Sequence, residues 1–150
     1  MISIKTFIKL NDEFIDIFNL NEKIKNNDYI DGAIELTING KVLMDKSMYD
    51  YIDDFWSYLS EGLYIVSQEK EFKCFFPDQP IEVNFIPQKE NRILVSVNCH
   101  EEIKTFVDKS EFLHVMTEHA KKFFEKLEDL NSASMGTRKS ALQFLDKINL

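Results

Sequence analysis

Apolar and polar side chains alternate with a period of two over several short stretches, the pattern of half-buried β-strands. The first stretch covers residues 2–10, where isoleucine and leucine alternate with serine and lysine. Residues 13–18 predict a second strand, with a short helix as the alternative, and the polar residues 19–28 predict a loop. Four more strands are expected over these ranges: 71–76, 80–87, 91–98 and 102–107.

A hairpin is expected around Asn39 and Gly40. A two-residue turn would place Val42 and Met44 on the sheet face opposite Leu36. A loop with an odd number of residues, with Gly40 in the left-handed conformation, would keep all these apolar side chains on one face. Because burial of apolar side chains outweighs turn statistics here, we expect the odd-numbered loop.

Three later stretches carry apolar side chains at helical spacing: residues 47–67, 110–130 and about 137–148. Ser47 and Asp50 resemble a capping box at the start of the first helix. Gly62 lies on its apolar arc, which indicates close packing or a local weak point. The other members of the arc are Met48, Tyr51, Ile52, Phe55, Trp56, Leu59, Leu63 and Val66.

The order of these elements predicts an α+β fold. We expect an antiparallel meander sheet of about six to eight strands, with a central long helix and two C-terminal helices packed on it. The chain has 150 residues, the size of one domain. Residues 1–130 are expected to form a single α+β domain. Residues 131–150 are expected to form a short linker and an amphipathic helix that belongs to the same domain or to a neighbour.

Composition and charge restrict the class of partner. The formal net charge is −8, which argues against nucleic acid and anionic membranes as partners and favours a basic protein.

No apolar run approaches the length of a membrane span, and the N-terminus lacks the pattern of a signal peptide. We therefore expect a cytoplasmic protein. Cys74 and Cys99 then predict buried, reduced thiols.

The acidic residues are concentrated in one segment. Residues 28–61 contain eight acidic side chains and two lysines. Four of the acids lie opposite the apolar arc of the first predicted helix: Asp50, Asp53, Asp54 and Glu61. Tyr64 lies among them. One interpretation is a solvated helix face, on which the helix dipole stabilises the acidic side chains of the first turn. The other is a docking face for a basic protein, with Tyr64 as an aromatic anchor.

The titratable clusters do not assemble a catalytic or metal site. His114 and His119 point about 140° apart on an ideal helix, so only His114 and Glu118 share a side. We expect His119 to be a hydrogen-bonded histidine at the edge of the core. Cys99 and His100 are adjacent, and adjacent side chains of a strand diverge, which favours a polar turn. We therefore expect no enzyme activity, no catalytic residues, no cofactor and no bound metal.

Three segments, residues 38–41, 51–59 and 76–85, carry a resemblance to a known group of proteins. Their order resembles small bacterial proteins of the polymorphic-toxin immunity type, over roughly residues 30–130. The resemblance implies a non-enzymatic cytosolic protein that neutralises a protein partner, and it carries over no active-site residues. Within the third segment, Pro77 and Pro80 predict a rigid turn around Asp78 and Gln79.

The favoured function is a cytosolic protein-binding domain, in particular an immunity protein that neutralises a basic toxin. One alternative is a small-ligand-binding protein or an enzyme whose site is assembled from scattered residues. Another is a structural module that self-associates through its C-terminal helix, where Arg138, Lys139 and Lys147 would contact a neighbour's acidic face. The candidate partner-binding residues are Asp50, Asp53, Asp54, Glu61, Tyr64, Asp78 and Gln79.

Overall fold

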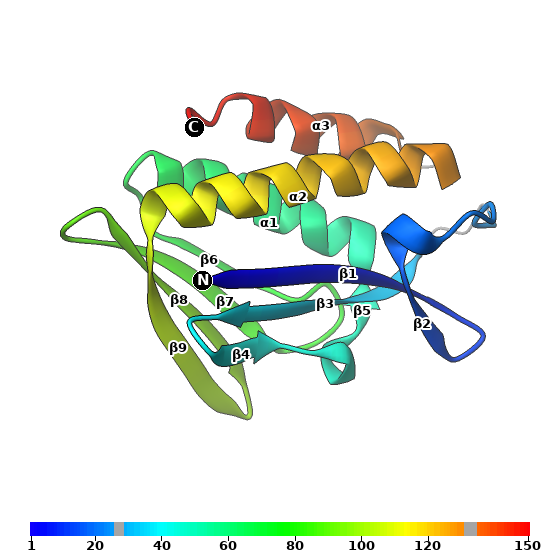
Figure 1. Ribbon diagram of the computed structural model, residues 1–150, viewed down its shortest axis with the longest axis horizontal. Coiled ribbons are helices and arrows are strands. Elements are labelled where there is room, and N and C mark those ends of the chain that lie inside the picture. The colour runs from blue at the N-terminus through cyan, green and yellow to red at the C-terminus, as the bar shows by residue number, and fades with distance from the viewer. Residues whose placement is uncertain (26–28, 131–134) are drawn as a thin grey trace.

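The computed structural model describes residues 1–25, 29–130 and 135–150. Figure 1 shows a layer of helices lying over a layer of strands, and the predicted α+β class is confirmed. The helices are α1 (Ile52–Ser67), α2 (Lys109–Leu130), α3 (Met135–Asp146) and the short 3-10 turns η1 (Ile17–Asn19) and η2 (Lys46–Met48). The strands are β1 (Ile2–Leu10), β2 (Glu13–Asp16), β3 (Asp31–Ile38), β4 (Lys41–Met44), β5 (Asp50–Tyr51), β6 (Phe72–Phe75), β7 (Glu82–Gln88), β8 (Arg92–Cys99) and β9 (Glu101–Asp108).

The strands divide between two antiparallel sheets, where the sequence analysis expected one. The first sheet has the order β2-β1-β3-β4, with β5 also paired to β3, and the second is the meander β6-β7-β8-β9. The sheets approach each other where β4 lies beside β9. There the Asn39 side chain donates to the Phe106 carbonyl at 2.9 Å, and Lys41 Nζ donates to the Lys104 carbonyl at 3.1 Å. Helix α1 separates the sheets in sequence, because the chain leaves the first sheet to form it.

The β3–β4 hairpin corrects the expected loop. Asn39 and Gly40 have φ angles of 51° and 83°, and the residues on either side of them pair, so the turn has two residues. The register then shifts within β4, the signature of a β-bulge. Leu43 and Met44 are both buried as a result, while Val42 is 52% exposed. The prediction was wrong because a bulge, rather than an odd-numbered turn, returns Met44 to the core.

The first predicted helix begins later than expected. The Asp45 side chain accepts a hydrogen bond from the Ser47 amide at the start of η2, and Asp50 then lies in β5. The proposed capping box is therefore wrong, since the helix starts only at Ile52. Residues 13–18 contain both alternatives, because a strand ends at Asp16 and a 3-10 turn follows.

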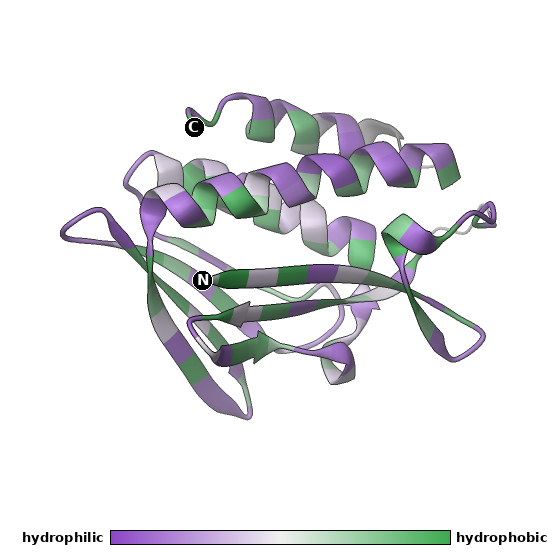
Figure 2. Cartoon of the chain, in the orientation of Figure 1, coloured by the Kyte–Doolittle hydropathy of each residue, from purple (hydrophilic) through white to green (hydrophobic). Residues whose placement is uncertain are grey.

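Helix α1 lies at the centre of the molecule and is buried on more than one side. It packs against both sheets and against α2 and α3. Three residues of the C-terminal segment, Ala141, Leu145 and Ile148, join the common hydrophobic core. In Figure 2, polar and apolar residues alternate along the strands, and polar residues cover much of the visible side of α2. Most of the expected linker, residues 131–134, lies outside the described residues.

The core is rich in aromatic rings, in keeping with the 13 phenylalanines of the chain. Its largest fully buried side chains include Trp56, Phe85, Phe112, Phe123 and Phe124. Within the parts of the chain that the structure describes, no helix combines the length and apolar character needed to cross a membrane.

Candidate functional site

Asp50 is buried and joins β5 to the loop between β6 and β7. Its side chain is 6% exposed and accepts hydrogen bonds from the amide of Tyr51 at 2.7 Å and from the amide of Asp78 at 3.1 Å. Gln79 Nε2 lies 3.4 Å from the same carboxylate and 2.6 Å from the Tyr49 carbonyl. The prediction that Asp50 lies on an exposed helix face is wrong, because β5 begins before the helix and directs the carboxylate toward the loop.

The loop after β6 is held by these contacts. The Phe76 amide donates to the Ile81 carbonyl at 2.9 Å, which closes the loop that contains Pro77 and Pro80. Gln79 is half-buried, and its side-chain amide is hydrogen-bonded within the protein. The side chain of Asp78 is exposed. Of the two predicted residues in the loop, Asp78 presents its carboxylate to solvent.

Helix α3 covers the side of α1 that was expected to face solvent. Asp53 is 4% exposed, and burial followed by the nearby Asp54 raises the pKa of its carboxyl. Arg138 is 3% exposed, and burial lowers its pKa while the charge of Asp53 opposes that change. Tyr64 packs on Phe144 of α3, with 5.7 Å between ring centroids. The predicted exposure of this side of α1 is therefore wrong for Asp53, which is buried, and Tyr64 is half-buried against α3.

Asp54 and Glu61 are more exposed than Asp53. Glu61 is exposed, and Asp54 is half-buried. Burial, followed by the charge of Asp50, raises the pKa of Asp54. Tyr58 lies nearby with 41% of its surface exposed, and burial followed by Asp54 raises the pKa of its hydroxyl. These two acids leave part of the expected acidic face on the surface.

Four tyrosines gather with the exposed acids on one surface. Tyr29 and Tyr51 stack with 4.4 Å between ring centroids, and Asp31 is the cross-strand partner of Tyr51. A depression with a cavity volume of about 300 Å³ is lined by residues of β5, of the segment before it and of the loop after β6. We call this region the tyrosine–acid surface, and it comprises Tyr29, Asp31, Tyr49, Tyr51, Asp54, Tyr58 and Asp78.

The pKa of Tyr51 reports the electrostatics of this surface. The charge of Asp78 makes the largest contribution to raising it, followed by burial, by Tyr29 and then by Asp31 and Asp50. Several carboxylates thus act on a single hydroxyl, which indicates a concentrated negative potential. The tyrosines around the acids, apart from Tyr64, were not among the predicted site residues. A signal was present, because all five tyrosines of the chain lie between residues 29 and 64, within or next to the acidic segment.

The histidines and Cys74 show no arrangement typical of a catalytic or metal site among the described residues. His119 Nε2 lies 2.8 Å from the Thr6 hydroxyl, which confirms a hydrogen-bonded histidine at the core edge, and His114 is exposed. His100 has a φ of 69° in the tight turn between β8 and β9, as expected. Burial, with a smaller effect of Glu61, raises the pKa of the Cys74 thiol to about 12, so the nucleophilic thiolate is disfavoured. No cluster of three or more potential metal ligands occurs among the described residues.

The chain matches no family model, and comparisons with curated proteins and with solved structures find no match. The resemblance to immunity proteins stays a prediction.

Proposed function

We propose that the chain is a non-enzymatic protein-binding domain that captures a basic protein on its tyrosine–acid surface, as an immunity protein captures a toxin. The observation that carries this proposal is the gathering of four tyrosines and three carboxylates on one side. Tyr29, Tyr49 and Tyr58 are 60%, 44% and 41% exposed. Tyrosine is enriched at protein interfaces because one ring offers apolar contact area together with a hydroxyl.

The charge of the surface favours a basic partner. Lysine or arginine side chains of such a partner would pair with Asp31, Asp54 and Asp78 and would stack over the tyrosine rings. The net charge of −8 would accelerate encounter with a cationic protein. The same charge would repel the phosphate backbone of a nucleic acid. These features favour a protein as the partner.

The surface is also held in place before binding. Asp50 accepts hydrogen bonds from two residues of the loop that carries Asp78. A surface that is ordered in advance loses less conformational entropy when a partner binds. Asp50 therefore contributes to the proposed binding as a structural support, while Asp31 and Asp78 would make the contacts.

The test is co-expression with the product of the gene immediately upstream, with growth of the host and the dissociation constant of the purified pair as readouts, and an upstream product that is acidic or does not bind would overturn the immunity role. We expect Asp31→Lys with Asp78→Lys to weaken binding on the order of 100-fold, because two interfacial charge pairs become repulsive. The matched control is Glu125→Lys with Asp129→Lys, which makes the same charge change at two exposed positions of α2. An equal loss in both double variants would show dependence on net charge alone and would overturn the proposed site, as would undiminished binding in the first.

A further inference from the structure

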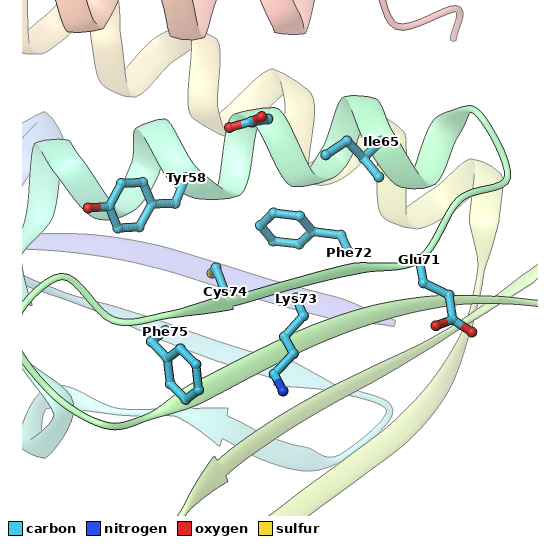
Figure 3. Close-up of a pocket in the computed structure, with 8 residues that line it drawn as sticks. Tyr58, Ile65, Glu71, Phe72, Lys73, Cys74 and Phe75 are labelled. Carbon is cyan, nitrogen blue, oxygen red and sulfur yellow. The ribbon is translucent and has the colours of Figure 1, made fainter.

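A groove runs between α1 and β6, next to the tyrosine–acid surface. Its cavity volume is about 440 Å³. One wall consists of Tyr58, Glu61 and Ile65, at helical spacing along α1, and the other consists of the consecutive residues 71–75. Figure 3 shows Phe72 and Cys74 on the side of the strand that faces α1, where Tyr58 also lies, whereas Lys73 and Phe75 point away from the helix. Tyr58 belongs to both the groove and the tyrosine–acid surface, so the two regions are continuous.

Strand β6 is an edge strand with one main-chain side unpaired. It is the outermost strand of the sheet, whose strand order is β6-β7-β8-β9, and it pairs only with β7 in this sheet. The Phe76 amide donates to the Ile81 carbonyl directly beyond the last paired residues of the ladder. In an antiparallel ladder, every second residue forms hydrogen bonds to the neighbouring strand. Because Phe76 is hydrogen-bonded to β7, Cys74, two residues earlier, must also be hydrogen-bonded to β7. The amides and carbonyls of the intervening Lys73 and Phe75 therefore point away from β7.

The free edge is kept at a fixed distance from α1. The ring of Phe72 packs on Gly62, where an added Cβ would lie 2.4 Å from two ring atoms. This contact places an apolar floor under the groove, because Phe72 is 8% exposed. Among the described residues, no loop or side chain hydrogen-bonds to the main chain of Lys73 or Phe75. The edge is thus supported by α1 while its outward main-chain groups stay open.

The walls of the groove carry negative charge. Glu61 and Glu71 are both exposed. The one lysine of the groove, Lys73, forms an ion pair with Glu82 of β7, at 3.0 Å. Phe75 is 52% exposed, and its ring points away from α1. The combination of open main-chain groups, exposed aromatic rings and unbalanced carboxylates fits an extended segment that contains basic residues.

We propose that an extended lysine- or arginine-containing segment of the protein partner adds to β6 as the fifth strand of this sheet. Its main chain would exchange hydrogen bonds with Lys73 and Phe75, the mode known as strand addition. Its basic side chains would lie beside Glu61 and Glu71. This inference rests on the proposed function, since it specifies how part of the same basic partner would bind.

The probe is a fluorescein-labelled peptide of alternating lysine and valine, measured by fluorescence anisotropy. A peptide of alternating lysine and proline, with the same number of lysines, is the control for charge, because proline lacks the amide that a strand must donate. We expect the first peptide to bind at least 10-fold more tightly than the second. Equal binding of the two peptides, or no binding of the first, would overturn strand addition.

Two protein variants separate the main chain from the side chain. Phe75→Ala and Phe75→Pro both remove the ring, but only proline removes the outward amide, and an edge strand tolerates proline where its amide faces away from the sheet. We expect binding of the lysine–valine peptide to weaken at least 10-fold more in Phe75→Pro than in Phe75→Ala, with equal unfolding midpoints. Equal binding by the two variants would count against the inference.

Hydrogen exchange supplies a readout at the proposed contact. The amides of Lys73 and Phe75 should exchange rapidly in the free protein and become protected with the lysine–valine peptide, while the Cys74 amide is protected in both. Protection at Lys73 and Phe75 without peptide, together with a dimeric mass, would identify a second copy as the occupant and overturn the proposal. If the peptide fails while the product of the upstream gene binds in a manner that depends on Asp31 and Asp78, only strand addition fails and the proposed function stands.

Discussion

The hydrogen-bonded cluster around His119 makes a quantitative prediction about acid stability. The Thr6 hydroxyl lies 2.8 Å from His119 Nε2 and accepts a hydrogen bond from Trp56 Nε1 at 3.1 Å. Burial lowers the pKa of His119 to about 4; Asp16 opposes this shift and Lys122 adds to it. The folded protein therefore holds the imidazole neutral at pH values where the unfolded chain binds a proton.

The sign and size of the effect follow from this difference. Above the ordinary histidine pKa of about 6.5, both states are neutral and the group adds no pH dependence. As the pH falls below that value, the unfolded chain gains a proton first, so stability decreases until the folded state is also protonated near pH 4. Linkage gives a loss of about 2 kcal/mol between pH 7 and pH 5, and about 3 kcal/mol by pH 4.

The assay is urea unfolding of the native protein and of His119→Gln at several pH values. Glutamine retains a group that can hydrogen-bond with Thr6 but cannot be protonated, so its stability should fall less on acidification. The difference between the two curves should change by about 2 kcal/mol from pH 7 to pH 5. His114→Gln is the matched control, because His114 is exposed on the same helix. A constant difference between the native protein and His119→Gln would refute the assignment of His119 as a buried, neutral imidazole.

Two further predictions concern the packing of α1, both measured by urea unfolding at pH 7. Gly62→Ala should destabilise the fold by about 1–3 kcal/mol, because the added methyl group overlaps the Phe72 ring. This cost should exceed the gain from the better helix propensity of alanine. An unchanged or higher stability would contradict the contact between Gly62 and Phe72. Asp53→Leu and Arg138→Met should each destabilise the fold, and the double variant should cost about 0.5–3 kcal/mol less than their sum, because the charge of each side chain favours the charged form of the other. Additive costs would mean that the two side chains do not act as a pair.

Alternation along the strands predicted most of the sheet, since each pattern reports one buried face. Val83 and Phe85 of β7 are buried, and so are Val95 and Val97 of β8, as a period of two requires. The β3–β4 hairpin shows the limit of this reasoning. Alternation demands that Met44 return to the core, but a bulge and an odd-numbered turn both meet that demand. Only the paired register distinguishes them.

The errors on α1 have a different physical cause. The periodicity of a helix shows which side is apolar, but it does not show whether a second helix packs on the polar side. Helix α3 does so, and it buries Asp53 and brings Phe144 onto Tyr64. The small residue Ser60 on α1 is fully buried and bonds back to the Trp56 carbonyl at 2.7 Å. Small side chains among the acids were the available sign that another helix could approach closely.

The position of the proposed binding surface follows from the same rearrangement. With the helix starting at Ile52, Asp50 leaves the helix face and binds the loop after β6. That contact brings Asp78 close to Tyr51, since Asp78 has the largest effect on its pKa. Acids that are distant in the chain, such as Asp31 and Asp78, thereby become neighbours around exposed tyrosines. The hydrogen bonds of Asp50 hold this arrangement in the free protein, which would lower the entropic cost of the proposed binding.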